Sequence, residues 1–136
     1  MRVSILMVVS VGLGLLVTNP SFAEAESVCS EAQTTIEIGE CVGKAYKKAD
    51  AELNAVWKKV MATFKSNDYM PADDLKTWRE TLLASQRDWI KFKEEDCEAV
   101  GYEWFGGTGR FNAVVFCLLD RTTTRTKDLK ARFLDR

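Results

Sequence analysis

Residues 86–117 read QRDWIKFKEEDCEAVGYEWFGGTGRFNAVVFC, and this stretch decides the fold. Its first part, from Gln86 to Cys97, has apolar residues at helical spacing. Residues 101–109 then form an aromatic, glycine-rich break, and a new helical run leads to Cys117. A cysteine on each side of one loop predicts two helices joined by a loop that a disulfide closes.

The first 23 residues have the layout of a signal peptide. Arg2 is followed by an apolar run over residues 3–17, a break at Asn19-Pro20 and small residues before Ala23. The run is shorter than the roughly 20 residues that span a bilayer, so we expect cleavage after Ala23 and no stable membrane insertion. Residues 24–136 then form one exported domain, either periplasmic or secreted.

Four cysteines in a small exported chain indicate disulfides and not a metal site. Proximity favours Cys29–Cys41 and Cys97–Cys117, each closing a short loop. The two other pairings, which join distant segments, remain possible. Each short-loop disulfide should stabilise the fold by about 3 kcal/mol.

Three helical segments follow one another along the domain. Thr34 and Glu37 have the spacing of a capping box, ahead of an apolar-periodic run over residues 35–65. Pro71 opens a second run that ends near Gly101, where a left-handed cap is expected. A third runs over residues 110–134. The sequence predicts an all-α, antiparallel three-helix bundle with a short N-terminal helical turn and two disulfides. We expect Ser85, Phe92 and Asp96 on the inner face of the second helix, and Val114 and Leu118 on that of the third.

The composition excludes several kinds of chemistry. The chain has no histidine, so it lacks a Ser-His-Asp site and an imidazole metal ligand. Disulfides would leave no thiolate nucleophile, and a net charge of −1 argues against a nucleic-acid partner. The adjacent carboxylates of residues 94–96 point in different directions on a helix. We expect no enzyme, no cofactor and no metal.

Four polar residues lie beside the predicted apolar faces. Asp50 and Asn54 are one helical turn apart, and Gln86 and Arg125 flank the faces of the other two helices. A buried charge needs a partner, so one hypothesis is a polar network that joins Arg125 to Asp50, completed by Asn54 and Gln86. The alternative is that all four are solvated flanking residues.

The loop is the best candidate for a binding surface. Three aromatics stand beside glycines that allow unusual backbone angles, and a disulfide at the loop base would preorganise it. We expect Trp104 to face solvent as an anchor for a protein partner and Phe105 to fold back onto the end of the bundle. The candidate target-binding residues are Tyr102, Glu103, Trp104, Phe105, Gly106, Gly107 and Thr108.

An ordered set of residues resembles the lysozyme inhibitor LprI-like family of small exported bacterial proteins. The matching positions are Thr35, Glu37, Cys41, Asp50, Leu53, Asn54, Gln86, Trp89, Cys97, Gly106, Gly107, Thr108, Cys117, Arg125 and Leu129. The resemblance implies a helical, disulfide-bonded envelope domain and inhibition of lysozyme. Thr108 replaces the serine usual in the family, Lys93-Glu94 replaces Arg-Asp, and the named member's lipid-attachment cysteine is missing.

The expected partner is therefore a protein, either lysozyme or another peptidoglycan hydrolase. Two further hypotheses are an immunity module against another wall hydrolase and an envelope scaffold without inhibitory activity. Acidic residues around the loop would favour association with basic lysozyme.

Overall fold

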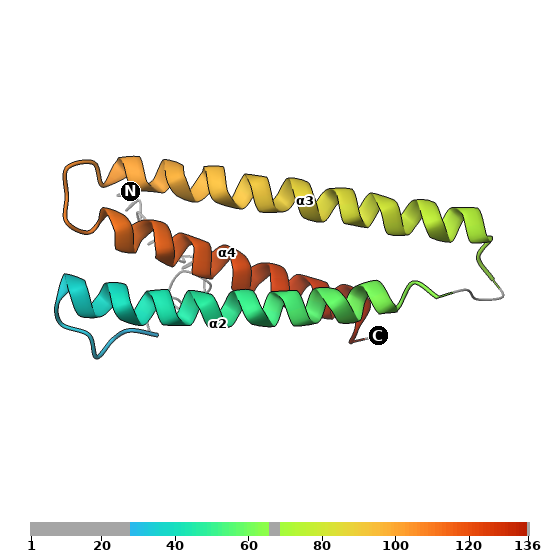
Figure 1. Cartoon of the computed structure of the whole chain (residues 1–136), viewed down its shortest axis with the longest axis horizontal. Helices are drawn as coiled ribbons and strands as arrows, with labels where there is room; N and C mark the ends of the chain where they lie inside the picture. The colour runs from blue at the N-terminus through green and yellow to red at the C-terminus, as the bar shows by residue number, and fades with distance from the viewer. Residues whose placement is uncertain (1–27, 66–68, 136) are drawn as a thin grey trace, which may run out of the picture.

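The described part of the chain, residues 28–65 and 69–135 of a computed structural model, forms three helices. Helix α2 spans Thr35–Ala62, α3 spans Ala72–Glu103 and α4 spans Arg110–Phe133. α3 runs antiparallel to the other two, and α4 lies between α2 and α3 (Figure 1). The predicted three-helix bundle is confirmed. None of these helices is long and apolar enough to cross a membrane. The expected signal peptide lies outside the described residues.

The capping box at the start of α2 is present as predicted. The Thr34 hydroxyl accepts a hydrogen bond from the Glu37 N–H at 3.2 Å. The Glu37 carboxylate accepts hydrogen bonds from the backbone N–H groups of Gln33 and Thr34, both at 3.0 Å. These backbone hydrogen bonds, helped by the Thr34 hydroxyl, hold the pKa of Glu37 below its ordinary value.

The end of α3 differs from the prediction. Gly101 is a buried helical residue, and the helix continues to Glu103. A Cβ atom at Gly101 would lie 2.8 Å from Cγ2 of Val114, so the glycine permits a close approach of α3 to α4. The positive backbone angle that a cap would need appears instead at Gly106 in the loop, with φ of 79°.

The core follows α2 and α4 from one end of the bundle to the other. One cluster, near the α3–α4 loop, consists of Cys29, Val42, Val115 and Leu119. The second, toward the other end, consists of Leu53, Val56, Val60, Leu82 and Leu129. At the far end the rings of Phe64 and Trp78 meet edge to face, with centroids 4.8 Å apart. Both Val114 and Leu118, expected inside, are only partly buried, because the inner face of α4 is centred on Val115 and Leu119.

The inner face of α3 was also predicted wrongly. Ser85 and Phe92 are exposed and Asp96 is half-buried, whereas Gln86 and Lys93 are buried. Cys97 has to face α4 to reach Cys117, which fixes the rotation of the helix. Residues four and eleven positions before Cys97 share its face, and these are Lys93 and Gln86.

Both predicted disulfides are confirmed. Cys29 is bonded to Cys41 and Cys97 to Cys117, with no free cysteine in the chain. Cys41 lies in the second turn of α2, while Cys97 and Cys117 join α3 to α4 within two turns of the loop. Both cross-links therefore belong to the half of the bundle that carries the loop.

Candidate functional site

The loop between α3 and α4 is a compact turn. The N–H of Phe105 donates to the carbonyl of Tyr102 at 3.1 Å, and the N–H of Gly107 donates to the carbonyl of Trp104 at 3.0 Å. Gly106 supplies the left-handed backbone angle within the second of these turns. The backbone of the loop is thus held by its own hydrogen bonds, and the Cys97–Cys117 disulfide holds the helices at its base.

The two loop aromatics that follow α3 are both exposed, although only Trp104 was expected to be. Phe105 is 78% exposed and does not fold back onto the bundle, so that prediction is wrong. The Trp104 ring instead lies over Gly109, where a Cβ atom would be 3.3 Å from Cε3 and Cζ3. Trp104 still leaves 53% of its surface exposed. Its ring is therefore both positioned by the loop and available to a partner.

Two further apolar side chains extend this surface. Ile36 in the first turn of α2 and Phe111 in the first turn of α4 are exposed, and both line a shallow depression with Thr108. Sequence analysis missed them because it looked for inward-facing residues, and an exposed apolar residue at a helix start carries no periodic signal. We use the name loop-end surface for Ile36, Tyr102, Trp104, Phe105 and Phe111.

The last ten residues of α3 make this end acidic. They contain five carboxylates and no lysine or arginine: Glu94, Glu95, Asp96, Glu98 and Glu103. Three of them form ion pairs, namely Glu95 with Lys91, Asp96 with Arg121 and Glu98 with Arg110. Glu103 has no ion pair within the described residues. It is the last residue of α3, so its charge adds to the negative end of the α3 dipole.

Arg110 links the loop to α3. Its guanidinium lies 3.1 Å from the Glu98 carboxylate and stacks over the Tyr102 ring, 4.8 Å from the centroid. Tyr102 is thereby oriented by α4 although it belongs to α3. The two predicted loop residues Tyr102 and Glu103 are helical, and the remaining candidates from Trp104 to Thr108 form the turn itself.

The predicted four-residue polar network forms as two separate pairs. Arg125 donates from Nε to Gln86 Oε1 at 2.9 Å, and Asn54 donates to Asp50 Oδ2 at 3.1 Å. The expected link between Arg125 and Asp50 is absent, because the guanidinium is turned toward α3, where it also lies 5.6 Å from the Trp89 ring centroid. Its Nη2 atom is buried and has no hydrogen-bond partner among the described residues. Burial lowers the pKa of Arg125, and the nearby charge of Arg132 acts in the same direction.

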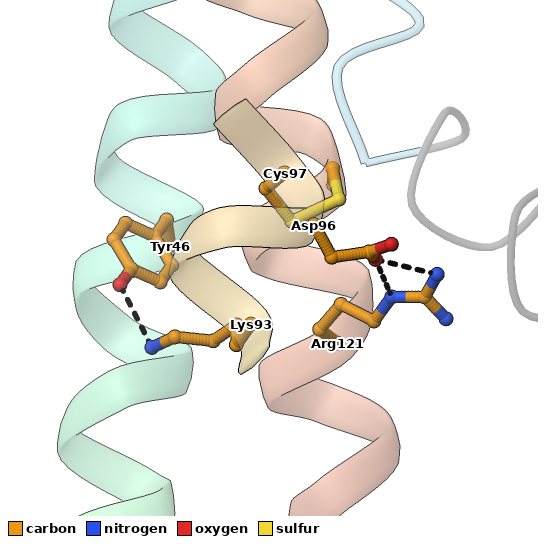
Figure 2. Close-up of a disulfide and its surroundings, with 6 residues drawn as sticks. Tyr46, Lys93, Asp96, Cys97 and Arg121 are labelled. Carbon is orange, nitrogen blue, oxygen red and sulfur yellow. Dashed lines mark hydrogen bonds and ion pairs between the residues drawn. A yellow bond between two sulfur atoms is a disulfide. The ribbon is translucent and has the colours of Figure 1, made fainter. Parts of the chain in front are cut away.

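A buried lysine, missed by sequence analysis, crosses the bundle near the second disulfide (Figure 2). Lys93 is only 4% exposed, and its ammonium donates to the Tyr46 hydroxyl at 3.3 Å. The same nitrogen lies 5.5 Å from the Tyr46 ring centroid and 5.3 Å from that of Trp89. Aromatic faces and one hydroxyl thus hold the charge in place of a carboxylate. The one signal in the sequence is that Lys93 follows Trp89 by one helical turn.

The second disulfide also bears on metal binding. Among the described residues, Asp96, Cys97 and Cys117 are a group close enough together to hold an ion. The two sulfur atoms are bonded to each other, and the Asp96 carboxylate is paired with Arg121 at 2.8 Å, so none of the three is available as a ligand (Figure 2).

Comparison with known protein families gives one match. The family described as "Lysozyme inhibitor LprI" matches residues 26–129. An uncharacterized protein of Rhizobium meliloti (strain 1021) is 32% identical over 125 residues, which cover 89% of this chain and 90% of that protein. No solved structure matches the chain. Because the match extends over more than half of the chain, the chain belongs to the lysozyme inhibitor LprI family.

Proposed function

We propose that this protein is exported to the periplasm or the cell exterior and inhibits lysozyme, with the loop-end surface as its contact. One observation carries the proposal. Tyr102 at the end of α3 and Trp104 and Phe105 in the turn that follows are exposed together, beside an acidic helix end and above a disulfide that joins α3 to α4. Large aromatics on a rigid support are the residues that supply most of the binding energy in protein interfaces.

The charge of this end suits the proposed target. Lysozyme is basic and has an open cleft, so a partner with an acidic rim associates with it faster than a neutral partner does. Glu94 and Glu103, which have no ion pair within the described residues, would supply that rim. Trp104 would supply the anchor, since its ring is held over Gly109 and loses little freedom on binding.

Both disulfides and family membership support the assignment to the cell exterior. Structural disulfides persist in oxidising compartments such as the periplasm and are rare in the cytosol. Residues 1–23 have the composition of a signal peptide that is removed on export.

The test is lysis of a peptidoglycan suspension by chicken-type and by goose-type lysozyme, with the oxidised chain from Glu24 onward titrated in. We expect dose-dependent protection against at least one enzyme. The double variant Trp104→Ala/Glu103→Ala should weaken inhibition by at least about 30-fold, which corresponds to the loss of a binding hot spot.

The matched control is Phe92→Ala/Asp88→Ala on the outer face of α3. Phe92 is 52% exposed, nearly the same as Trp104, but lies outside the loop-end surface. This variant should inhibit as the parent does. Protein that has been reduced and alkylated before mixing should not inhibit. Unchanged inhibition by the Trp104 variant would place the contact on another surface. No protection at large molar excess of folded protein would refute lysozyme as the target and direct the search to other wall hydrolases.

A further inference from the structure

A groove of about 550 Å³ runs beside Trp104, on one side of α4. Its floor is the half-exposed face of α4, on which Gly109, Ala113, Phe116 and Asp120 follow one another at helical spacing. Residues of α2 and α3 form the two walls. From Gly109, just before α4, to Asp120 the floor extends over eleven residue steps, or about 16 Å at 1.5 Å per residue.

α4 lies between α2 and α3 along the bundle (Figure 1). Tyr46 of α2 contacts Lys93 of α3, and farther along the ring of Phe64, beyond the end of α2, meets that of Trp78 in α3. Near the loop, Ile38 of α2 and Val100 of α3 both line the groove.

The lining of the groove combines apolar and acidic side chains. The middle is apolar, formed by Ile38, Val100, Ala113 and Phe116, with the Trp104 ring at the loop end. Two carboxylates, Glu103 and Asp120, belong to the lining, and no lysine or arginine does. Asp120 is half-buried and forms no ion pair within the described residues; its neighbour Arg121 is engaged by Asp96. The groove therefore combines an apolar channel with negative charge that nothing in it balances.

We propose that the groove is a socket for an arginine or lysine side chain of a basic protein partner. The aliphatic stem of the side chain lies against Phe116 and Val100, and its cationic head pairs with Asp120. Asp120 is the better partner than Glu103, because a half-buried carboxylate is screened less by water and salt than one on the rim. That the partner is a basic protein rests on the proposed function. The preference of the groove for an alkyl cation can be measured without lysozyme.

The probe is n-hexylguanidinium, compared with n-hexanol and hexanoate as neutral and anionic analogues. Binding is followed by NMR through the indole N–H of Trp104, assigned with a Trp104→Phe variant. We expect saturable binding of the guanidinium on the order of millimolar, as for other ligands of this size, with weaker binding of hexanol and none of hexanoate. Asp120→Asn should weaken guanidinium binding about fivefold and leave hexanol unchanged.

Two controls keep the test decisive. Asp88→Asn, on the outer face of α3, should leave all three titrations unchanged. Ala113→Leu, which fills the floor of the groove, should abolish binding of guanidinium and hexanol alike, and the NMR spectrum reports whether each variant is folded.

Equal binding of all three probes, or insensitivity to Asp120→Asn, would overturn the proposal, as would the absence of any binding. Concentration-dependent self-association that Ala113→Leu abolishes would also overturn it, because the occupant would then be a second copy of this chain. If the guanidinium binds as expected but lysozyme is not inhibited, the socket stands and the proposed target fails.

Discussion

The same substitution at two helical glycines is expected to have opposite effects on stability. Gly43 lies inside α2, and a Cβ atom there would meet nothing within 4 Å. Gly101 lies inside α3, and a Cβ atom there would lie 2.8 Å from Val114 Cγ2 and 3.3 Å from Arg110 Nε. Alanine therefore gains helix propensity at both positions but has space only at Gly43.

The magnitudes follow from these two environments. Gly43→Ala should stabilise the fold by about 1 kcal/mol, the usual gain from replacing a helical glycine. Gly101→Ala gains the same amount but forces α3 and α4 apart, at a cost of about 1–3 kcal/mol. Its free energy of unfolding should fall by about 0–2 kcal/mol. The two variants should thus differ by about 1–3 kcal/mol.

The assay is equilibrium unfolding in urea, followed by circular dichroism of the oxidised chain from Glu24. The free energy of unfolding falls by about 1–2 kcal/mol per molar of urea, so each kcal/mol of changed stability moves the midpoint by about 0.5–1 M. A double-mutant cycle with Val114→Ala identifies the clash, because removing the Val114 methyls should cost less in the Gly101→Ala background than alone. If Gly101→Ala stabilises as much as Gly43→Ala, the close approach of α3 to α4 at this position is refuted.

Further substitutions test the polar pair and the cap. Arg125→Met should lower the free energy of unfolding by about 1–3 kcal/mol, since it leaves the buried Gln86 oxygen unpaired. Adding Gln86→Leu should recover part of that loss. If urea unfolding shows no loss of stability in Arg125→Met alone, Arg125 and Gln86 are not a structural pair. Thr34→Ala should cost about 1 kcal/mol at pH 7. Because the folded-state pKa of Glu37 is lowered, its contribution is present above the unfolded pKa and is lost as the pH falls through the folded pKa. In Glu37→Gln the free energy of unfolding should therefore fall less steeply as the pH is lowered. An unchanged fall would show that the Glu37 carboxylate does not stabilise the cap.

The helices and their cross-links were predictable because their causes are local. A capping box needs only residues three apart, and the apolar period of α2 places Val42, Leu53, Val56 and Val60 in the core. Short-loop disulfides follow from spacing and an exported context. None of these features depends on how the helices turn relative to one another.

The rotation of α3 was not predictable, because its inner face is partly polar. Lys93 is buried against Tyr46, which lies 47 residues earlier in the chain, and Gln86 is paired with Arg125, 39 residues later. These partners meet only after the bundle has formed, so apolar periodicity selected Phe92 in place of Lys93. The same reasoning applies to the loop, where Trp104 covers Gly109 and leaves Phe105 in solvent. Trp104 and Phe105 are adjacent in the chain, and apolar periodicity does not distinguish between them.

Both disulfides belong to the half of the bundle that carries the loop, while the other half is held by side-chain packing such as that of Phe64, Trp78 and Phe133. Partial opening should therefore begin at the far end, and amide hydrogen exchange should slow progressively toward the loop. A protease that cuts at the far end would leave α3 and α4 joined through Cys97 and Cys117, with the loop-end surface between them. The fold is thus expected to keep its most persistent order where the proposed contact with a partner is made.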